Sequence, residues 1–103
     1  MGNRAKKTRQ KARYQKMSYT LIIEKHPQKF LSRLTGKMYR SVSAAINALA
    51  DDPRPPGCTE LKPYPNTYRI RRVHIRIIYE VQDEKILIKI LDIGYRGQVY
   101  DNW

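Results

Sequence analysis

Four arginines and a tyrosine in the last third of this 103-residue chain carry the groups best suited to chemistry. In chain order they are Arg69, Arg71, Arg76, Arg96 and Tyr100. A guanidinium presents a planar fork of donors that matches the oxygens of a phosphate, and a phenol donates or accepts a proton. The set therefore indicates a site for a polyanion, with Arg96 and Tyr100 adding groups that can act on that anion.

Three segments must position these side chains, and each alternates apolar and polar residues with a period of two. That period is typical of a strand that is buried on one face. We expect strands at about 67–72, 75–82 and 85–92, with turns at Val73–His74 and Gln82–Lys85. The arginines then lie on strands that pair as two successive hairpins.

The first hairpin has a register that follows from its short turn. Ile70 faces Ile77 on an apolar face, and Arg71 faces Arg76 on the other face. Two like charges opposite each other destabilise a sheet that has no ligand. One interpretation is a cradle for a phosphate. The other is that an acid such as Glu80 relieves the pair, or that the two side chains splay into solvent.

The second hairpin is expected to pair Ile77 with Ile90 and Tyr79 with Ile88. This register makes one face of the sheet wholly apolar and leaves the other face cationic. The cationic face would hold Arg69, Arg71, Arg76 and Lys89, with Ile78, Leu87 and Leu91 between them. Gly94 is expected to break the alternation, so that the segment carrying Arg96 and Tyr100 leaves the sheet beside the arginines.

The residues before these strands predict one further strand and two helices. Residues 19–24 are β-branched and apolar, and Pro27 suits the first turn of a helix. Apolar side chains at helical spacing predict helices at about 26–34 and 37–50, and a Pro-rich loop covers 53–66. The fold class is therefore α+β in the order βααβββ, with an αα-hairpin packed on one face of an antiparallel four-stranded sheet.

The charge divides the chain into an arm and a body. The formal net charge is +12, and residues 1–16 hold seven basic side chains and no acid. Residues 17–103 hold fourteen basic and nine acidic side chains, a net +5. We expect a disordered basic arm at 1–16 and one folded domain at 17–103. Such charge favours a nucleic acid or an anionic membrane surface and does not by itself choose between them.

The cysteine count and the apolar runs limit the cellular compartment and the cofactors that we expect. A single cysteine, Cys58, cannot form an internal disulfide or a metal cluster, which favours a reducing cytoplasm. No apolar run approaches the ~20 residues of a membrane span, so a membrane partner is not expected. No metal or other cofactor is expected either, since one thiol cannot hold a metal cluster. His26 is interpreted as a helix N-terminal residue. For Trp103 three roles stay open: folding back on the sheet, stacking on RNA, or meeting a partner.

The run YRIRR…IRIIYEV…ILIKILDIGYRGQVY resembles the RelE/ParE superfamily of bacterial and archaeal toxins. Members typically show a basic strand, then a strand of the form Y/I-R-I-I/V-Y-x-V, then a hairpin ending in G-H-R-x-x-V-Y. The resemblance covers Met17 to about Tyr100 and extends to the order of the elements. It implies a RelE-like toxin domain at 17–103 with a fold similar to that of microbial ribonucleases.

The resemblance further implies a messenger RNA interferase, the toxin of a type II toxin–antitoxin system. Such toxins act in the decoding site of the ribosome without a metal, and the ribose 2′-hydroxyl attacks its own 3′-phosphate. Matched to the family's motifs, Arg76 would clamp the phosphate, and Arg96 would clamp it or donate a proton. Arg69 and Arg71 would bind phosphate and stabilise charge. Tyr100 would stack on a base or act as general base.

The partners implied by the resemblance are a cognate antitoxin, the ribosome and messenger RNA. One alternative on the same fold is a ParE-like toxin that poisons DNA gyrase without cutting RNA. Another is a catalytically inactive homologue that binds RNA or an antitoxin. The set of Arg76, Arg96 and Tyr100 favours the nuclease, because inhibition of gyrase needs no anion clamp beside a tyrosine.

Overall fold

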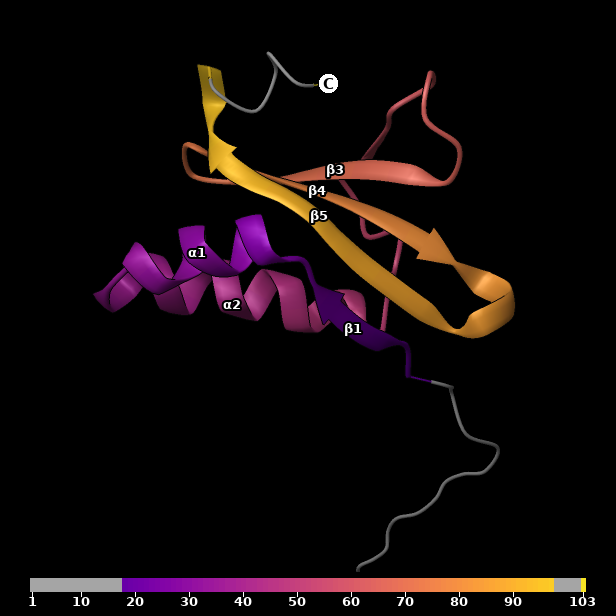
Figure 1. The fold of residues 1–103 in the computed structure, drawn as a ribbon, viewed down its shortest axis with the longest axis horizontal. Coiled ribbons are helices and arrows are strands. Elements are labelled where there is room, and N and C mark those ends of the chain that lie inside the picture. Colours follow the sequence, from indigo (N-terminus) through magenta and orange to yellow (C-terminus); the bar gives the residue numbers. More distant parts are fainter. Residues whose placement is uncertain (1–17, 98–102) are drawn as a thin grey trace, which may run out of the picture.

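Five strands form one sheet in the computed structural model, which describes residues 18–97 and residue 103 (Figure 1). Within these residues the strands lie in the order β1-β5-β4-β3-β2. Their bounds are β1 Thr20–Ile23, β2 Thr59–Glu60, β3 Thr67–Arg72, β4 Ile75–Gln82 and β5 Leu87–Tyr95. The longest strands, β4 and β5, lie next to each other in the middle of the sheet and carry most of its pairing.

The α+β class and the order βααβββ are confirmed, and the sheet differs from the expected one in two details. β1 pairs with β5 in parallel, Thr20 opposite Leu87, so the sheet is mixed and not wholly antiparallel. β2 adds a short edge strand in which Thr59 pairs with Arg69. Alternation of apolar and polar residues indicates which face of the sheet a residue occupies, but it does not indicate the direction of the strand. The parallel pairing therefore could not be predicted from it.

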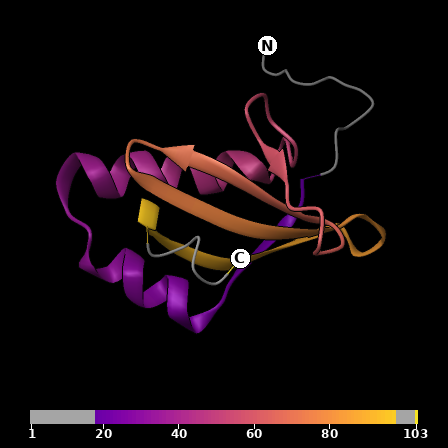
Figure 2. The ribbon, with the colours of Figure 1, turned by 90° about the horizontal axis from the view of Figure 1, so that it is seen from above.

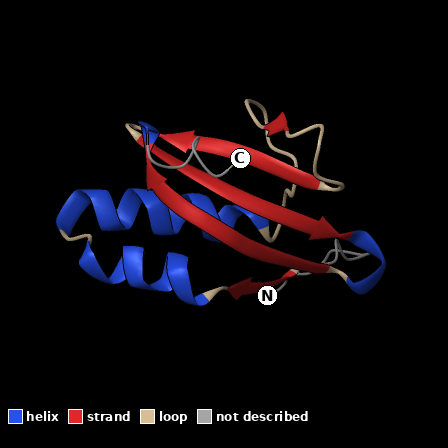
Figure 3. Ribbon diagram, turned by 45° about the horizontal axis from the view of Figure 1, so that its top comes forward, coloured by secondary structure: helices blue, strands red, loops and turns tan. Residues whose placement is uncertain are grey.

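Two helices, α1 Lys25–Arg33 and α2 Gly36–Leu49, form the expected αα-hairpin and cover one face of the sheet (Figures 2 and 3). α2 buries its apolar side: Val42, Ala45, Ile46 and Leu49. The sheet supplies the other half of the core: Ile70, Ile75, Ile77, Tyr79, Val81, Ile88, Ile90 and Ile93. No helix in the described part of the chain is long and apolar enough to span a membrane.

The first hairpin has the expected register. Ile70 pairs with Ile77 and Arg71 pairs with Arg76 across β3 and β4. Val73 takes a left-handed backbone conformation with a φ of 57° at the turn and is 64% exposed. A β-branched residue is strained in that conformation, so the two-residue turn forms because the paired strands on either side hold it.

The second hairpin is shifted from the expected register. Tyr79 pairs with Ile90, and Val81 pairs with Ile88. The shift arises at the turn, where a 3₁₀ segment, Asp83–Lys85, is followed by Ile86 in a left-handed conformation with a φ of 52°. The turn therefore extends over positions 85 and 86, which were expected to begin the last strand, and β5 starts at Leu87. Because the shift is by two residues, the apolar side chains still face the helices.

A β-bulge further along the same hairpin changes which side chains reach the other face of the sheet. The register slips between Ile78 and Tyr79, so that Ile78 pairs with Asp92. One extra residue in a strand reverses the alternation beyond it. Ile93 therefore joins the core, while Asp92 and Gly94 join the face that the helices leave uncovered.

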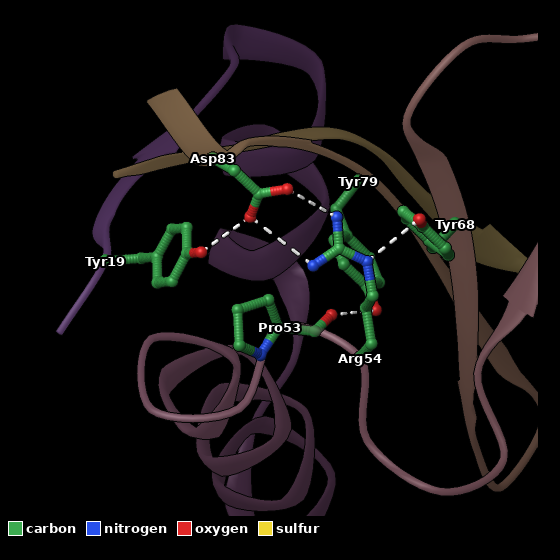
Figure 4. Close-up of polar contacts among 6 residues, drawn as sticks. All are labelled: Tyr19, Pro53, Arg54, Tyr68, Tyr79 and Asp83. Atoms are coloured by element: carbon green, nitrogen blue, oxygen red, sulfur yellow. Dashed lines mark hydrogen bonds and ion pairs between the residues drawn. The ribbon is translucent and has the colours of Figure 1, made fainter. Parts of the chain in front are cut away.

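A cluster of polar side chains ties four separate segments together at the β4–β5 turn (Figure 4). Arg54 donates from Nη2 to Asp83 Oδ2 at 2.8 Å and from Nε to the Tyr68 hydroxyl at 2.9 Å. Tyr19, just before β1, donates its hydroxyl to Asp83 Oδ1 at 2.6 Å. The cluster thus joins β1, the loop after α2, β3 and the turn.

Acid should weaken this cluster. Hydrogen bonds from Arg54 and then from Tyr19 hold the pKa of Asp83 below its ordinary value of 3.8. A carboxyl whose pKa is depressed by folding stabilises the fold above its unfolded pKa, and that stabilisation is lost as the pH falls through and below it. We expect the urea midpoint of unfolding to fall between about pH 6 and about pH 3, and to fall less in Asp83→Asn. Equal falls in Asp83→Asn and in the neighbouring control Glu84→Gln would contradict this role.

Candidate nucleic-acid interface

The open face is the side of the sheet that the helices leave uncovered, and arginines gather at its end nearest the β3–β4 turn. There Arg71 of β3 pairs with Arg76 of β4, and Arg76 pairs on its other side with Gly94 of β5. Arg76 is only 4% exposed, while Arg71 is exposed. The pair thus places one buried and one exposed arginine at neighbouring positions of the same face.

Arg69 lies in the next row of the open face. It pairs with Ile78 of β4, which in turn pairs with Asp92 of β5. Its Nη2 donates to the hydroxyl of Thr59 at 3.3 Å, which holds the side chain against β2. The row therefore runs from a cation through an apolar residue to an acid.

Arg96 joins the arginine end of the face, although the expected break in the strand does not occur at Gly94. Gly94 is buried and paired within β5, and the strand continues to Tyr95. The backbone N–H of Arg96 then donates to the carbonyl of His74 at 3.0 Å. This bond places Arg96 beside the β3–β4 turn, at the same end of the sheet as Arg76. Tyr100 lies outside the described residues.

Lys89 lies toward the other end of the open face, since it pairs with Glu80 and not with Ile78 as expected. Glu80 itself pairs with Thr67 and accepts a hydrogen bond from Gln82 at 3.3 Å. The interpretation that Glu80 relieves the Arg71–Arg76 pair is therefore wrong, because Glu80 lies two rows away. The face separates a cluster of four arginines from Lys89.

Asp92 is the acid that lies closest in register to the arginines, and it was not among the predicted site residues. It is only 7% exposed. Its Oδ1 lies 3.2 Å from Nε2 of His26, at the start of α1, and its Oδ2 accepts from the indole N–H of Trp103 at 3.0 Å. The sequence held one signal for it: a single acid within an apolar run, ILIKILDIG, has to face either a partner or solvent.

Trp103 folds back on the sheet, the first of the three roles left open for it, and nothing in this placement tests the other two. Besides its bond to Asp92, it packs edge to face on Tyr64, with ring centroids 4.8 Å apart and planes at 72°. Tyr64 lies in the loop between β2 and β3. Trp103 therefore bridges the open face from β5 to that loop, and the chain end marked C lies on the side of the sheet away from the helices (Figure 1).

A pocket of about 320 Å³ lies elsewhere, between α2, the loop before β2 and the β3 edge. Its floor is apolar and includes Ala45, Leu49 and Ile70. Arg71 and Arg72 line it from β3. The pocket combines an apolar floor with cationic side chains, which suits an apolar side chain flanked by acids.

Comparison with known families gives a match over most of the chain. Residues 23–100 match the family described as the ParE toxin of the type II toxin–antitoxin system parDE. Among solved structures, the archaeal RelE–RelB complex from Pyrococcus horikoshii OT3 is similar, with 30% sequence identity and a TM-score of 0.70. That match covers 80% of this chain and 99% of the other.

Two further structures share the fold at lower identity. The isolated Escherichia coli RelE toxin has 22% identity and a TM-score of 0.68, covering 82% of this chain and 94% of the other. The Mycobacterium tuberculosis RelBE2 toxin–antitoxin complex has 22% identity and a TM-score of 0.64, covering 77% and 99%. No curated protein matches the chain.

Proposed function

This chain belongs to the RelE/ParE superfamily and is the toxin of a type II toxin–antitoxin system, and on that premise we propose that it is a ribosome-dependent endoribonuclease that cuts messenger RNA. One observation carries the proposal: Arg71 and Arg76 pair directly on the open face, with Arg96 at the same end of the sheet. Arginines gathered at one end of a sheet face suit a polyanion, because each guanidinium presents a fork of donors that matches phosphate oxygens.

The proposed reaction needs no external nucleophile. The ribose 2′-oxygen attacks the adjacent phosphorus while a base takes the 2′ proton, and the bond from phosphorus to the next 5′-oxygen breaks. An acid protonates that oxygen, which leaves a cyclic phosphate and a free 5′-hydroxyl. Negative charge builds on the phosphate oxygens in the transition state, where fixed cations stabilise it most.

The residues divide this work by depth and position. Arg76, nearly buried, would clamp the phosphate, with Arg71 and Arg69 binding neighbouring oxygens. Arg96, exposed at the edge, would clamp the phosphate or protonate the leaving oxygen. Tyr100 would stack on a base or take the 2′ proton. Lys89 would contact a phosphate further along the strand of RNA, because it lies away from the arginines.

Primer extension on messenger RNA in programmed ribosomes tests the proposal. We expect cuts within the codon of a vacant A site, none without ribosomes, and slower cutting in Tyr100→Phe. Chelation of divalent metals after the ribosomes are cross-linked should leave the cuts in place. Intact message under conditions in which the toxin stops growth would exclude the nuclease.

Poisoning of DNA gyrase is the second candidate, and the family match itself favours it, since the matching family is described as the ParE toxin. A supercoiling assay with purified gyrase separates the two activities. Inhibited supercoiling together with intact message would support the ParE-like function and remove the nuclease.

A cognate antitoxin is the proposed partner, as in the P. horikoshii and M. tuberculosis complexes. Residues 17–103 carry a net +5, which attracts an acidic chain. The pocket of about 320 Å³ beside α2 would take an apolar side chain of that partner, with Arg71 and Arg72 pairing its acids. The arm at 1–16, which lies outside the described residues, would add affinity for RNA that does not depend on sequence.

A further inference from the structure

We propose that Trp103 and Tyr64 form a stacking site for an unpaired nucleobase of the RNA whose phosphate lies at the arginines. The inference rests on the proposed function and adds a base-recognition site to it. Aromatic rings beside cations are the common means of holding single-stranded nucleic acid, because every base has a π-face and every nucleotide a phosphate.

The indole of Trp103 is held in a fixed place on the open face. Its N–H donates to Asp92 Oδ2 at 3.0 Å, and that carboxylate is 7% exposed and also contacts His26. Tyr64 packs its ring edge to face with the indole, at a centroid distance of 4.8 Å. A ring fixed at its polar edge and supported on one side loses little freedom when a base stacks on it.

The surroundings of the two rings suit a nucleotide. Asp92 pairs with Ile78, and Ile78 pairs with Arg69, so the row spans two strand spacings, about 10 Å. Ile78 is 1% exposed and gives this row an apolar middle. The aromatic pair, held at Asp92, and the guanidinium of Arg69 thus share one row of the face, so a nucleotide that stacks on the rings can place its phosphate at the arginine.

A protein partner fits this row less well. Trp103 and Tyr64 are only partly exposed, and in the described part of the chain the row beside them holds an acid, a buried isoleucine and an arginine, which gives a helix no apolar stripe to lie on. The antitoxin has a better apolar contact at the pocket beside α2. We therefore assign the aromatic pair as the binding site for a flat ring with polar edges, and in RNA that ring is a nucleobase.

The chain contains one tryptophan and eight tyrosines, so fluorescence excited selectively at the indole reports on Trp103 alone. The full chain is titrated with a short single-stranded RNA whose 2′-hydroxyls are replaced by hydrogen, which blocks cleavage. A second titration uses inorganic polyphosphate, which carries phosphates without bases. We expect the oligonucleotide to quench the fluorescence and polyphosphate to bind without quenching it.

Variants at Trp103 distinguish a loss of base stacking from a loss of the fold. Trp103→Leu should weaken oligonucleotide binding about tenfold, in line with the loss of one stacked base, and leave polyphosphate binding unchanged. Trp103→Phe, which keeps a ring but loses the bond to Asp92, should lose less. The matched control is Tyr39→Leu, which removes an exposed aromatic ring from α2, on the other side of the sheet. Melting temperatures of all variants identify any loss of fold.

Each result decides the inference. Unchanged or tighter oligonucleotide binding in Trp103→Leu overturns it, and tighter binding would mean that Trp103 only covers the face. If wild type cuts messenger RNA and Trp103→Leu binds like wild type, the inference fails while the proposed nuclease stands. If the oligonucleotide quenches and the variant binds weakly but no message is cut, the nuclease fails while the base site stands.

Discussion

Replacing Arg96 with alanine should lower the rate of ribosome-dependent messenger RNA cleavage by about 10²–10³-fold, the usual effect of removing one charged donor from a transition state. The side chain is exposed, so its loss should leave stability nearly unchanged. Arg96→Lys should recover part of the rate, because it restores the charge without the fork of donors. The measurement is single-turnover cleavage on programmed ribosomes at saturating toxin.

Arg33→Ala is the matched control for this change. Arg33 is also an exposed arginine, but it lies in the last turn of α1, on the helix side of the sheet. Both variants lose the same formal charge, so a general electrostatic effect on ribosome binding would slow both. Cleavage that is equally slow in both, or unaffected in Arg96→Ala, would remove Arg96 from the proposed site.

Truncating Tyr79 should have the largest effect on stability. The side chain is fully buried at the centre of β4, its ring stacks on Tyr68, and its hydroxyl donates to the carbonyl of Pro53 at 2.7 Å. Tyr79→Ala should reduce the free energy of unfolding by about 3–5 kcal/mol, as for other large aromatic residues in a core. That is a large share of the about 5–15 kcal/mol typical of a domain.

Tyr79→Phe isolates the hydroxyl. Burial raises the pKa of Tyr79, so the group stays protonated and donates throughout the working range of pH. Its removal should reduce the free energy of unfolding by about 1–3 kcal/mol, because the Pro53 carbonyl loses its donor. Urea unfolding gives both values, with Tyr39→Phe as an exposed control. A Tyr79→Phe variant as stable as wild type would show that water replaces the hydroxyl.

The elements were predictable where local patterns determine them. Alternation and a two-residue turn fix the β3–β4 hairpin, which is why Arg71 opposite Arg76 was predicted correctly. The β4–β5 register was not predictable, because it depends on a 3₁₀ turn and on Ile86 in a left-handed conformation that apolar periodicity does not signal. The parallel pairing of β1 was not predictable for a similar reason, since its partner β5 lies near the other end of the sequence.

The candidate site divides in the same way. The shared face of Arg69, Arg71 and Arg76 was predictable, because arginines in an alternating strand have only one polar face to occupy. Arg96 was expected beside them through a break at Gly94, but the strand continues past Gly94 and Arg96 follows it. The role of these residues in a site stays a prediction. The predicted position of Lys89 beside Ile78 was wrong, because the register shift places Lys89 opposite Glu80. Asp92 and Tyr64 were missed, because the bulge that turns Asp92 to the open face depends on packing in three dimensions. Tyr64 lies in a loop, and only its contact with Trp103, which the sequence does not indicate, distinguishes it from other loop residues.

The parallel pairing of β1 with β5 also sets the order in which the protein can fold during synthesis. β1, α1 and α2 leave the ribosome first, yet β1 has no neighbouring strand until residues 87–90 follow. Contacts between distant segments form late because a long loop must close, whereas β3, β4 and β5 can pair as each emerges. β1 and α1 therefore wait for the last strand, with the apolar face of α1 exposed, whereas α2 can pack on β3 before β5 is made. A partner that binds α1 would be most useful during that interval.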